Sequence, residues 1–253
     1  MSATAQGAAL ETLSPAPSLD RIRLARALAV IGIAGAMVAV VVVGALHVLP
    51  ETAAISPVRR TISEYALTDL GWAFNIGAAA LALGSVCILA ALVVIGRARR
   101  GSLGVALGMV WAAALLVVVL FPKHNWAVGP STNGQIHRVA SLIAFLSLPV
   151  AVLLLTRPGK ARGQARRQPV PARIAFWLGW LSLAWFGTII GAIALGPITG
   201  TPWYQAIPLG LVERGLVLTE VAAVIALGIW AVISTRRTRN PRPASQAQNV
   251  PTF

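Results

Sequence analysis

The chain has 253 residues, of which 57% are hydrophobic and 11% charged, and its mean hydropathy is +0.78. This composition excludes an ordinary soluble domain, in which about 25% of residues are charged, and predicts that the lipid bilayer is the solvent. The formal net charge is +14, but the basic residues lie mostly in short stretches between apolar runs, so they indicate membrane topology and no nucleic-acid partner.

The N-terminal segment is small, polar and proline-containing over its first twenty residues. No basic stretch leads directly into a short apolar core with a cleavage site, so we predict a disordered tail over 1–26 and no signal peptide. The only cysteine, Cys87, falls inside an apolar run. An intramolecular disulfide is therefore excluded.

Six apolar runs follow, at about 27–48, 71–96, 103–121, 138–155, 174–196 and 208–233. Each is near the ~20 residues that a helix needs to cross ~30 Å of hydrocarbon. The fourth run has the weakest pattern, because it is the shortest and contains Pro149, which removes a backbone donor and predicts a kink. We expect one all-α domain, a six-helix transmembrane bundle over 27–233, and a disordered basic tail over 234–253.

Basic residues decide the orientation of this bundle. Sixteen of the 21 lysines and arginines fall on one side: Arg21, Arg23, Arg26, Arg97, Arg99, Arg100, Arg157, Lys160, Arg162, Arg166, Arg167, Arg173, Arg236, Arg237, Arg239 and Arg242. The other five are Arg59, Arg60, Lys123, Arg138 and Arg214. The excess predicts that both termini are cytoplasmic and that the protein lies in the cell membrane.

Two glycine pairs, Gly104 with Gly108 and Gly187 with Gly191, have the GxxxG spacing that allows two membrane helices to approach closely. Both pairs are therefore candidates for close helix packing.

The polar residues that do not set topology gather on the predicted extracytoplasmic side, and all three histidines (His47, His124 and His137) lie there. They lack the HExxH or HxH spacing of a metal site, so we expect no metal and no cofactor. The sequence also has no P-loop, no GxSxG elbow and no dinucleotide fingerprint.

The segment TISEYALTDLGW, just before the second span, places carboxylates at the membrane surface. If it is helical, Glu64 would share a face with Thr68, and Tyr65 with Asp69. One interpretation is an acid/base or cation-binding site. The other is N-terminal capping of a helix by Thr61, Ser63 or Asp69.

Two further pairs lie near the same surface: His137 and Arg138 open the fourth span, and Glu213 and Arg214 lie in the first turns of the sixth. An ion pair between Arg214 or Arg138 and Glu64 or Glu213 would tie three helices together. The same residues would also suit a phosphate headgroup. Both interpretations stay open.

Glu220 follows Glu213 by seven residues, on the same helical face and roughly 10 Å deeper at ~1.5 Å per residue. An ionised carboxylate near the bilayer midplane costs several kcal/mol unless it is paired or wetted. We therefore expect Glu220 to be protonated or to face a polar partner such as Asn75 or Thr188. It is a candidate proton site or a hydrogen-bonded link between helices.

Four short motifs occur in order: ISEYALTDLGW before the second span, FP at the end of the third, GQIHR opening the fourth and ER in the sixth. In this combination, from about residue 47 to 233, the chain resembles a bacterial membrane family, domain of unknown function 998. The resemblance implies a six-helix bundle, and the family looks distantly similar to membrane proteins that handle lipids. The chain lacks a ceramidase-type histidine pair on a late helix, which argues against zinc hydrolysis.

Three classes of function remain, and whether the protein is an enzyme is left open. The best specific hypothesis is lipid or cell-envelope handling at the extracytoplasmic face, with membrane lipids as partners. A small proton-coupled transporter using Glu213 and Glu220, and a non-catalytic scaffold, are the alternatives. The candidate acid/base residues are Glu64, His137 and Glu213; the candidate substrate-binding residues are Ser63, Tyr65, Asp69, Arg138 and Arg214; the candidate proton site is Glu220.

Overall fold

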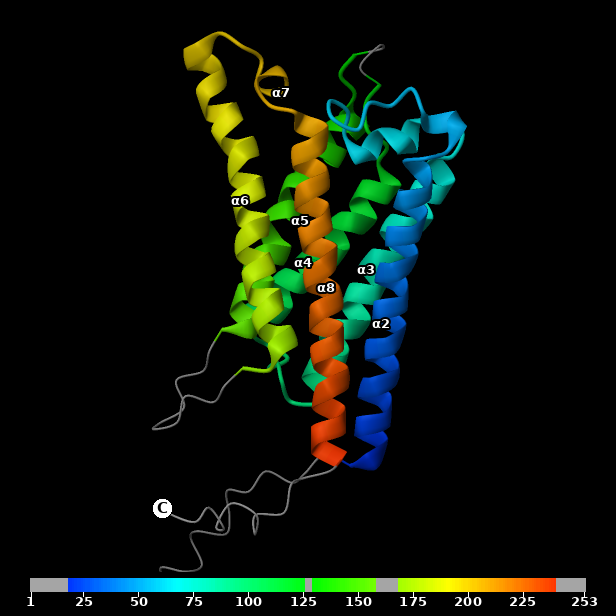
Figure 1. The fold of residues 1–253 in the computed structure, drawn as a ribbon, viewed down its shortest axis with the longest axis vertical. Helices are drawn as coiled ribbons and strands as arrows, with labels where there is room; N and C mark the ends of the chain where they lie inside the picture. Colours follow the sequence, from blue (N-terminus) through cyan, green and yellow to red (C-terminus); the bar gives the residue numbers. More distant parts are fainter. Residues whose placement is uncertain (1–17, 126–128, 158–167, 240–253) are drawn as a thin grey trace, which may run out of the picture.

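A computed structural model describes residues 18–125, 129–157 and 168–239 (Figure 1). Its long helices are α2 (Leu19–Leu46), α3 (Gly71–Val94), α4 (Leu103–Leu120), α5 (Thr132–Thr156), α6 (Val170–Thr199) and α8 (Leu209–Arg239). Three short elements complete it: η1 (Pro50–Thr52), η2 (Ile62–Leu67) and α7 (Trp203–Ala206). Each of the six long helices is long and apolar enough to cross a membrane, and the described residues contain no strand. The predicted all-α, six-span fold is confirmed.

The helix at the N-terminal end is longer than its apolar run. α2 begins at Leu19 because Ser18 caps it, its hydroxyl oxygen accepting from the backbone N–H of Arg21 at 3.4 Å. The prediction of a disordered tail over 1–26 is therefore wrong for residues 19–26, and residues 1–17 lie outside the described part. Likewise, α8 continues to Arg239, into the predicted 234–253 tail.

The fourth span, which had the weakest sequence pattern, is a 25-residue helix. Ser131 caps its first turn, since its hydroxyl oxygen accepts from the backbone N–H of Gly134 at 3.1 Å. The helix continues through Pro149. A polar cap outside the apolar run thus explains why α5 starts earlier than hydropathy predicts.

The six spans run side by side, so the connections collect at two ends of the bundle (Figure 1). We call the end that carries η1, η2, residues 121–125, the start of α5 and α7 the loop end. The end where α2 starts and α8 finishes is the tail end. α8 is the central helix: 61% of its most apolar window is buried, against 22% for α2 and for α6.

Small residues set the distance between neighbouring helices. At Gly32 of α2, an added Cβ would lie 2.5 Å from the carbonyl oxygen of Gly84 on α3, so only glycine permits this crossing. The candidate pair Gly104 and Gly108 also packs closely, against leucines of α5 and α3. The candidate pair on α6 does not, since a Cβ at Gly187 or Gly191 would meet no atom within 4 Å.

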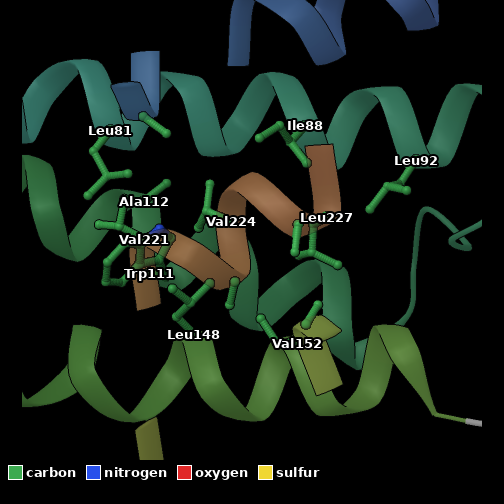
Figure 2. Packing of buried hydrophobic residues seen from close by; sticks show 14 of the residues in the cluster. Leu81, Ile88, Leu92, Trp111, Ala112, Leu148, Val152, Val221, Val224 and Leu227 are labelled. Carbon is green, nitrogen blue, oxygen red and sulfur yellow. The ribbon is translucent and has the colours of Figure 1, made fainter. Parts of the chain in front are cut away.

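The main core draws on all six long helices, and its large side chains come from α3, α4, α5 and α8 (Figure 2). Its largest member is Trp111 of α4, whose indole N–H donates to the Ser85 hydroxyl of α3 at 3.1 Å. Leu148 of α5 and Val224 of α8 pack in the same cluster. This cluster lies beneath the polar groups of the loop end.

Candidate functional site at the loop end

Arg214 of α8 holds the connection between α2 and α3 against the bundle through hydrogen bonds. Its Nε–H donates to His47 Nε2 at 2.7 Å, and its NH1 group donates to the carbonyl oxygens of Pro57 and Arg60 at 2.8 and 2.6 Å. Its NH2 group lies 3.3 Å from the Tyr65 hydroxyl. The fork of guanidinium donors therefore serves protein acceptors from three separate stretches of chain.

The hydrogen bonds of His47 assign its tautomer. Its Nδ1 lies 2.7 Å from the Val43 carbonyl oxygen, which can only accept, so Nδ1 carries the proton. Nε2 is then free to accept from Arg214. His47 thus acts as a neutral acceptor at the end of α2.

Gly210 allows the connection to lie directly on α8. A Cβ at this position would stand 2.4 Å from the Arg60 carbonyl oxygen and 2.6 Å from that of Pro57. The backbone N–H of Leu211 also donates to the Val58 carbonyl oxygen at 3.2 Å. The absence of a side chain at Gly210 therefore brings these carbonyl groups within reach of Arg214.

Glu213, the neighbour of Arg214, is buried and holds the start of η2. Its Oε2 accepts from the backbone N–H of Ile62 at 3.0 Å. A carboxylate that accepts from a buried backbone N–H supplies a partner that this helix start would otherwise lack.

Glu64 forms ion pairs with Lys123 and Arg60, and not with Arg214 or Arg138. Its Oε1 lies 3.0 Å from the Lys123 ammonium and 3.6 Å from the Arg60 guanidinium. The predicted ion pair of Arg214 or Arg138 with Glu64 or Glu213 is therefore wrong, since Arg138 donates instead to Gln135 at 2.6 Å.

The capping interpretation of TISEYALTDLGW is also wrong for the residues named. Thr61 precedes η2 without a side-chain capping bond, and its hydroxyl accepts from Lys123 at 2.5 Å. Ser63 pairs with the Thr61 hydroxyl at 3.2 Å. Asp69 is exposed, and α3 starts at Gly71 without a side-chain cap.

His137 presents an acceptor in a buried position near the start of α5. Its Nδ1–H donates to the Phe121 carbonyl oxygen at 2.9 Å, which leaves Nε2 as the acceptor nitrogen. That nitrogen is buried and has no hydrogen-bond partner among the described residues.

Two cavities meet at Glu213. The outer cavity, of about 120 Å³, lies against the loop end and is lined by polar residues that include Lys123, His137 and Arg138. The inner cavity, of about 370 Å³, runs along α8 between α2, α3, α4 and α5. Glu213 and Ser63 line both.

The inner cavity also reaches the surface that would face lipid. Its lining includes Val40 and Gly44 of α2 and Leu218 of α8, all of which are exposed. A Cβ at Gly44 would meet nothing within 4 Å. The opening between α2 and α8 therefore connects the cavity with the membrane.

Glu220 lies at the deep end of the inner cavity. Its side chain is 1% exposed, and neither carboxyl oxygen has a hydrogen-bond partner among the described residues. Of the two alternatives expected for Glu220, the polar partner is not found among the described residues, and the Thr188 hydroxyl donates to the Trp185 carbonyl oxygen. As predicted, Glu220 shares a helical face with Glu213, since both line this cavity.

The chain matches the model of a protein family over most of its length. The family model described as protein of unknown function (DUF998) matches residues 33–230, which include every cavity-lining residue named above. The chain belongs to DUF998. The comparisons with curated proteins and with solved structures found no match.

The candidate site residues of this DUF998 protein divide into two sets. Those that line one or both cavities are Ser63, His137, Arg138, Glu213, Arg214 and Glu220. Those that line neither are Glu64, Tyr65 and Asp69. Within the described ranges, no three histidine, cysteine or acidic side chains gather as metal ligands.

Sequence reasoning missed two members of the loop-end cluster. Lys123 entered only as a topology residue, although it lies in the polar FPKHNW stretch beside a predicted span. His47 entered only as one of three histidines without the spacing of a metal site, yet it is the acceptor for Arg214. The signal available for Lys123 was its position. It is a basic residue on the side of the membrane where the positive-inside rule predicts few basic residues.

Proposed function

We propose that this DUF998 protein takes up an amphiphilic lipid or cell-envelope intermediate from the extracytoplasmic leaflet. The observation that carries the proposal is the inner cavity: apolar walls, acidic groups at Glu213 and Glu220, and an opening toward lipid between α2 and α8. Its volume of about 370 Å³ falls within the ~300–1,000 Å³ typical of small-molecule sites. Such a cavity suits a ligand with one polar and one apolar part.

The assignment to the extracytoplasmic leaflet rests on charge. The loop end carries the minority of basic residues, and the opposite end carries the majority, which the positive-inside rule assigns to the cytoplasm. The lipid opening lies in the half of the bundle nearer the loop end, because Val40 and Gly44 are in the last two turns of α2 and Leu218 is in the first three turns of α8. A lipid of the outer leaflet would reach it by lateral diffusion.

Toward the loop end, the ligand would meet Glu213 and His137. Both line the outer cavity, and the Nε2 atom of His137 offers a buried acceptor without a partner among the described residues. These two groups are the candidates for a polar contact with the ligand and for proton transfer. Arg214 has a structural role instead, because its guanidinium donates to His47 and to the carbonyl oxygens of Pro57 and Arg60.

The two alternative functions have less support. A scaffold cluster would be closed and fully paired, whereas the Glu220 carboxyl lines a cavity without a partner among the described residues. A proton carrier needs a wet path to the tail end. The cavity beneath Glu220, between Ser85 and Leu227, measures about 10 Å³ and has apolar walls, which is barely the volume of one water.

The test compares two tryptophan variants of the full chain. Gly44→Trp places a large ring at the lipid opening, and Gly187→Trp places it on α6, at an equally open site away from the cavities. We would purify both variants and the wild type from their native membrane and quantify bound lipids by mass spectrometry.

We expect one amphiphile class to be enriched over the bulk membrane in the wild type and in Gly187→Trp, and to be lost in Gly44→Trp. Bound lipid that matches the bulk membrane in all three proteins would overturn the proposal.

A further inference from the structure

We propose that the ligand of the inner cavity carries an ammonium group that pairs with the Glu220 carboxylate. This inference rests on the proposed uptake of an amphiphile and names the chemical class of its polar group. It follows from the state of Glu220, from the other charged groups of the cavity and from its aromatic walls.

Glu220 is a buried polar group that the protein itself does not satisfy. It is 1% exposed, and both oxygens lack a hydrogen-bond partner among the described residues. A buried acceptor without a partner carries a desolvation cost that no hydrogen bond offsets. Glu220 is one of the residues that line the cavity, and the unused hydrogen-bonding capacity of its carboxyl offers a partner for a donor or a cation from outside.

The charge of the cavity favours a cation. Four titratable residues line it: His47, Glu213, Arg214 and Glu220. The Arg214 guanidinium donates to His47 and to backbone carbonyl groups at the loop end, and the hydrogen bonds of His47 keep that ring neutral. The two carboxyl groups are therefore the groups left to face a ligand, and an anionic phosphate deep in this cavity would be repelled.

Aromatic rings add to this preference. Phe74, Trp111 and Phe145, from three different helices, line the same cavity as Glu220. The Trp111 indole N–H is already donated to Ser85, so the ring contributes its π surface and not a hydrogen-bond donor. Aromatic faces attract ammonium groups, and such rings are a recurring means of recognising quaternary ammonium ligands.

The opening between α2 and α8 provides a route for the rest of the ligand. With the ammonium group at Glu220, an alkyl chain can leave past Val40, Gly44 and Leu218 into the membrane. Two sources share this chemistry: the amine of a lipid headgroup and a free lipophilic cation. The experiment separates them.

The test follows the reactivity of Glu220 in the full chain, reconstituted in vesicles of a neutral glycosyl diacylglycerol, which has no amine. Dicyclohexylcarbodiimide, a small apolar reagent, adds to a protonated carboxyl: the proton moves to a carbodiimide nitrogen and the carboxyl oxygen bonds to the central carbon. An acyl shift then leaves an N-acylurea, with no leaving group. Mass spectrometry of the Glu220 peptide measures the adduct, and Glu220→Gln is the blank.

Three additions are compared as protectants: dodecyltrimethylammonium, dodecanol of the same chain length, and phosphatidylethanolamine mixed into the vesicles. We expect the ammonium compound to protect Glu220 at a concentration at least ~10-fold lower than the alcohol, which corresponds to about 1.4 kcal/mol. Protection by phosphatidylethanolamine would assign the group to a lipid headgroup, and protection by dodecyltrimethylammonium alone would assign it to a free cation.

Two results would overturn the inference: no labelling of Glu220 in plain vesicles, or equal protection by the alcohol and the ammonium compound. Equal protection would still leave the uptake of an amphiphile standing. Conversely, selective protection by the ammonium compound, with no lipid enriched on the purified protein, would support the role of Glu220 and reject native lipid uptake.

Discussion

Arg214 and Glu220 lie six residues apart on α8, but their polar groups differ in how far the protein satisfies their hydrogen bonds. The Arg214 guanidinium is surrounded by acceptors from α2 and from the connection before α3. The Glu220 carboxyl is more deeply buried and has no partner among the described residues. Fully paired polar groups stabilise a fold, whereas an unpaired buried group is retained at a cost that function can explain. This contrast assigns Arg214 to the structural part of the loop end and Glu220 to the candidate ligand site.

The largest effect is expected at Arg214. Arg214→Met keeps the aliphatic stem but leaves His47 and the carbonyl groups of Pro57 and Arg60 without their donor. We expect the free energy of unfolding to fall by about 3 kcal/mol, the upper end of the range for hydrogen bonds to a charged group, because Arg214 is half-buried. Thermal unfolding in a mild detergent measures it.

Arg214→Lys is the control, because lysine keeps the charge and loses the fork geometry. We expect it to recover only part of the loss. A melting temperature for Arg214→Met equal to that of the wild type would remove the structural half of the contrast.

A smaller effect is expected where the connection meets α8. Gly210→Ala puts a Cβ 2.4 Å from the Arg60 carbonyl oxygen, so the connection must move away from Arg214. We expect a loss of about 1–3 kcal/mol, typical of overpacking. Gly187→Ala, where nothing lies within 4 Å, should be neutral or gain up to ~1 kcal/mol from helix propensity. Similar melting temperatures for the two variants would contradict the close contact.

The two carboxyl groups of the cavity should respond differently to the same change. Glu213→Leu leaves the Ile62 backbone N–H without its acceptor, and we expect a loss of about 1–3 kcal/mol. Glu220→Leu removes an unpaired group and should leave stability unchanged or raise it by a similar amount. Unfolding of both variants beside the wild type checks this. A marked destabilisation by Glu220→Leu would mean that the carboxyl has a partner within the protein.

The sequence predicted the fold well because a membrane span is a local property. Twenty consecutive apolar residues suffice to identify one, and six such runs became six helices. The ends of the helices were harder, because they depend on single polar residues outside the apolar run. Ser18 and Ser131 each add a turn or more that hydropathy does not register.

The sequence predicted only those features of the candidate site that follow from the periodicity of a single helix. Seven residues are about two helical turns, so the shared face of Glu213 and Glu220 followed from their spacing. The partner of Arg214, His47, is 167 residues away, and the partner of Glu64, Lys123, is 59 residues away. One sequence alone cannot pair residues across such distances, so the ion pair proposed for Arg214 was assigned to the wrong group.

The smallest effect is expected at the pair of Lys123 and Glu64, which lies near the surface of the loop end. The side chains are 9% and 14% exposed and their charged atoms are 3.0 Å apart. A double-mutant cycle with Lys123→Met and Glu64→Gln should give a coupling energy of about 1 kcal/mol, between that of exposed and buried pairs. Because the pair is only slightly exposed, salt should weaken it less than an exposed pair such as Asp20 with Arg23. A coupling energy near zero would contradict a stabilising ion pair between Lys123 and Glu64.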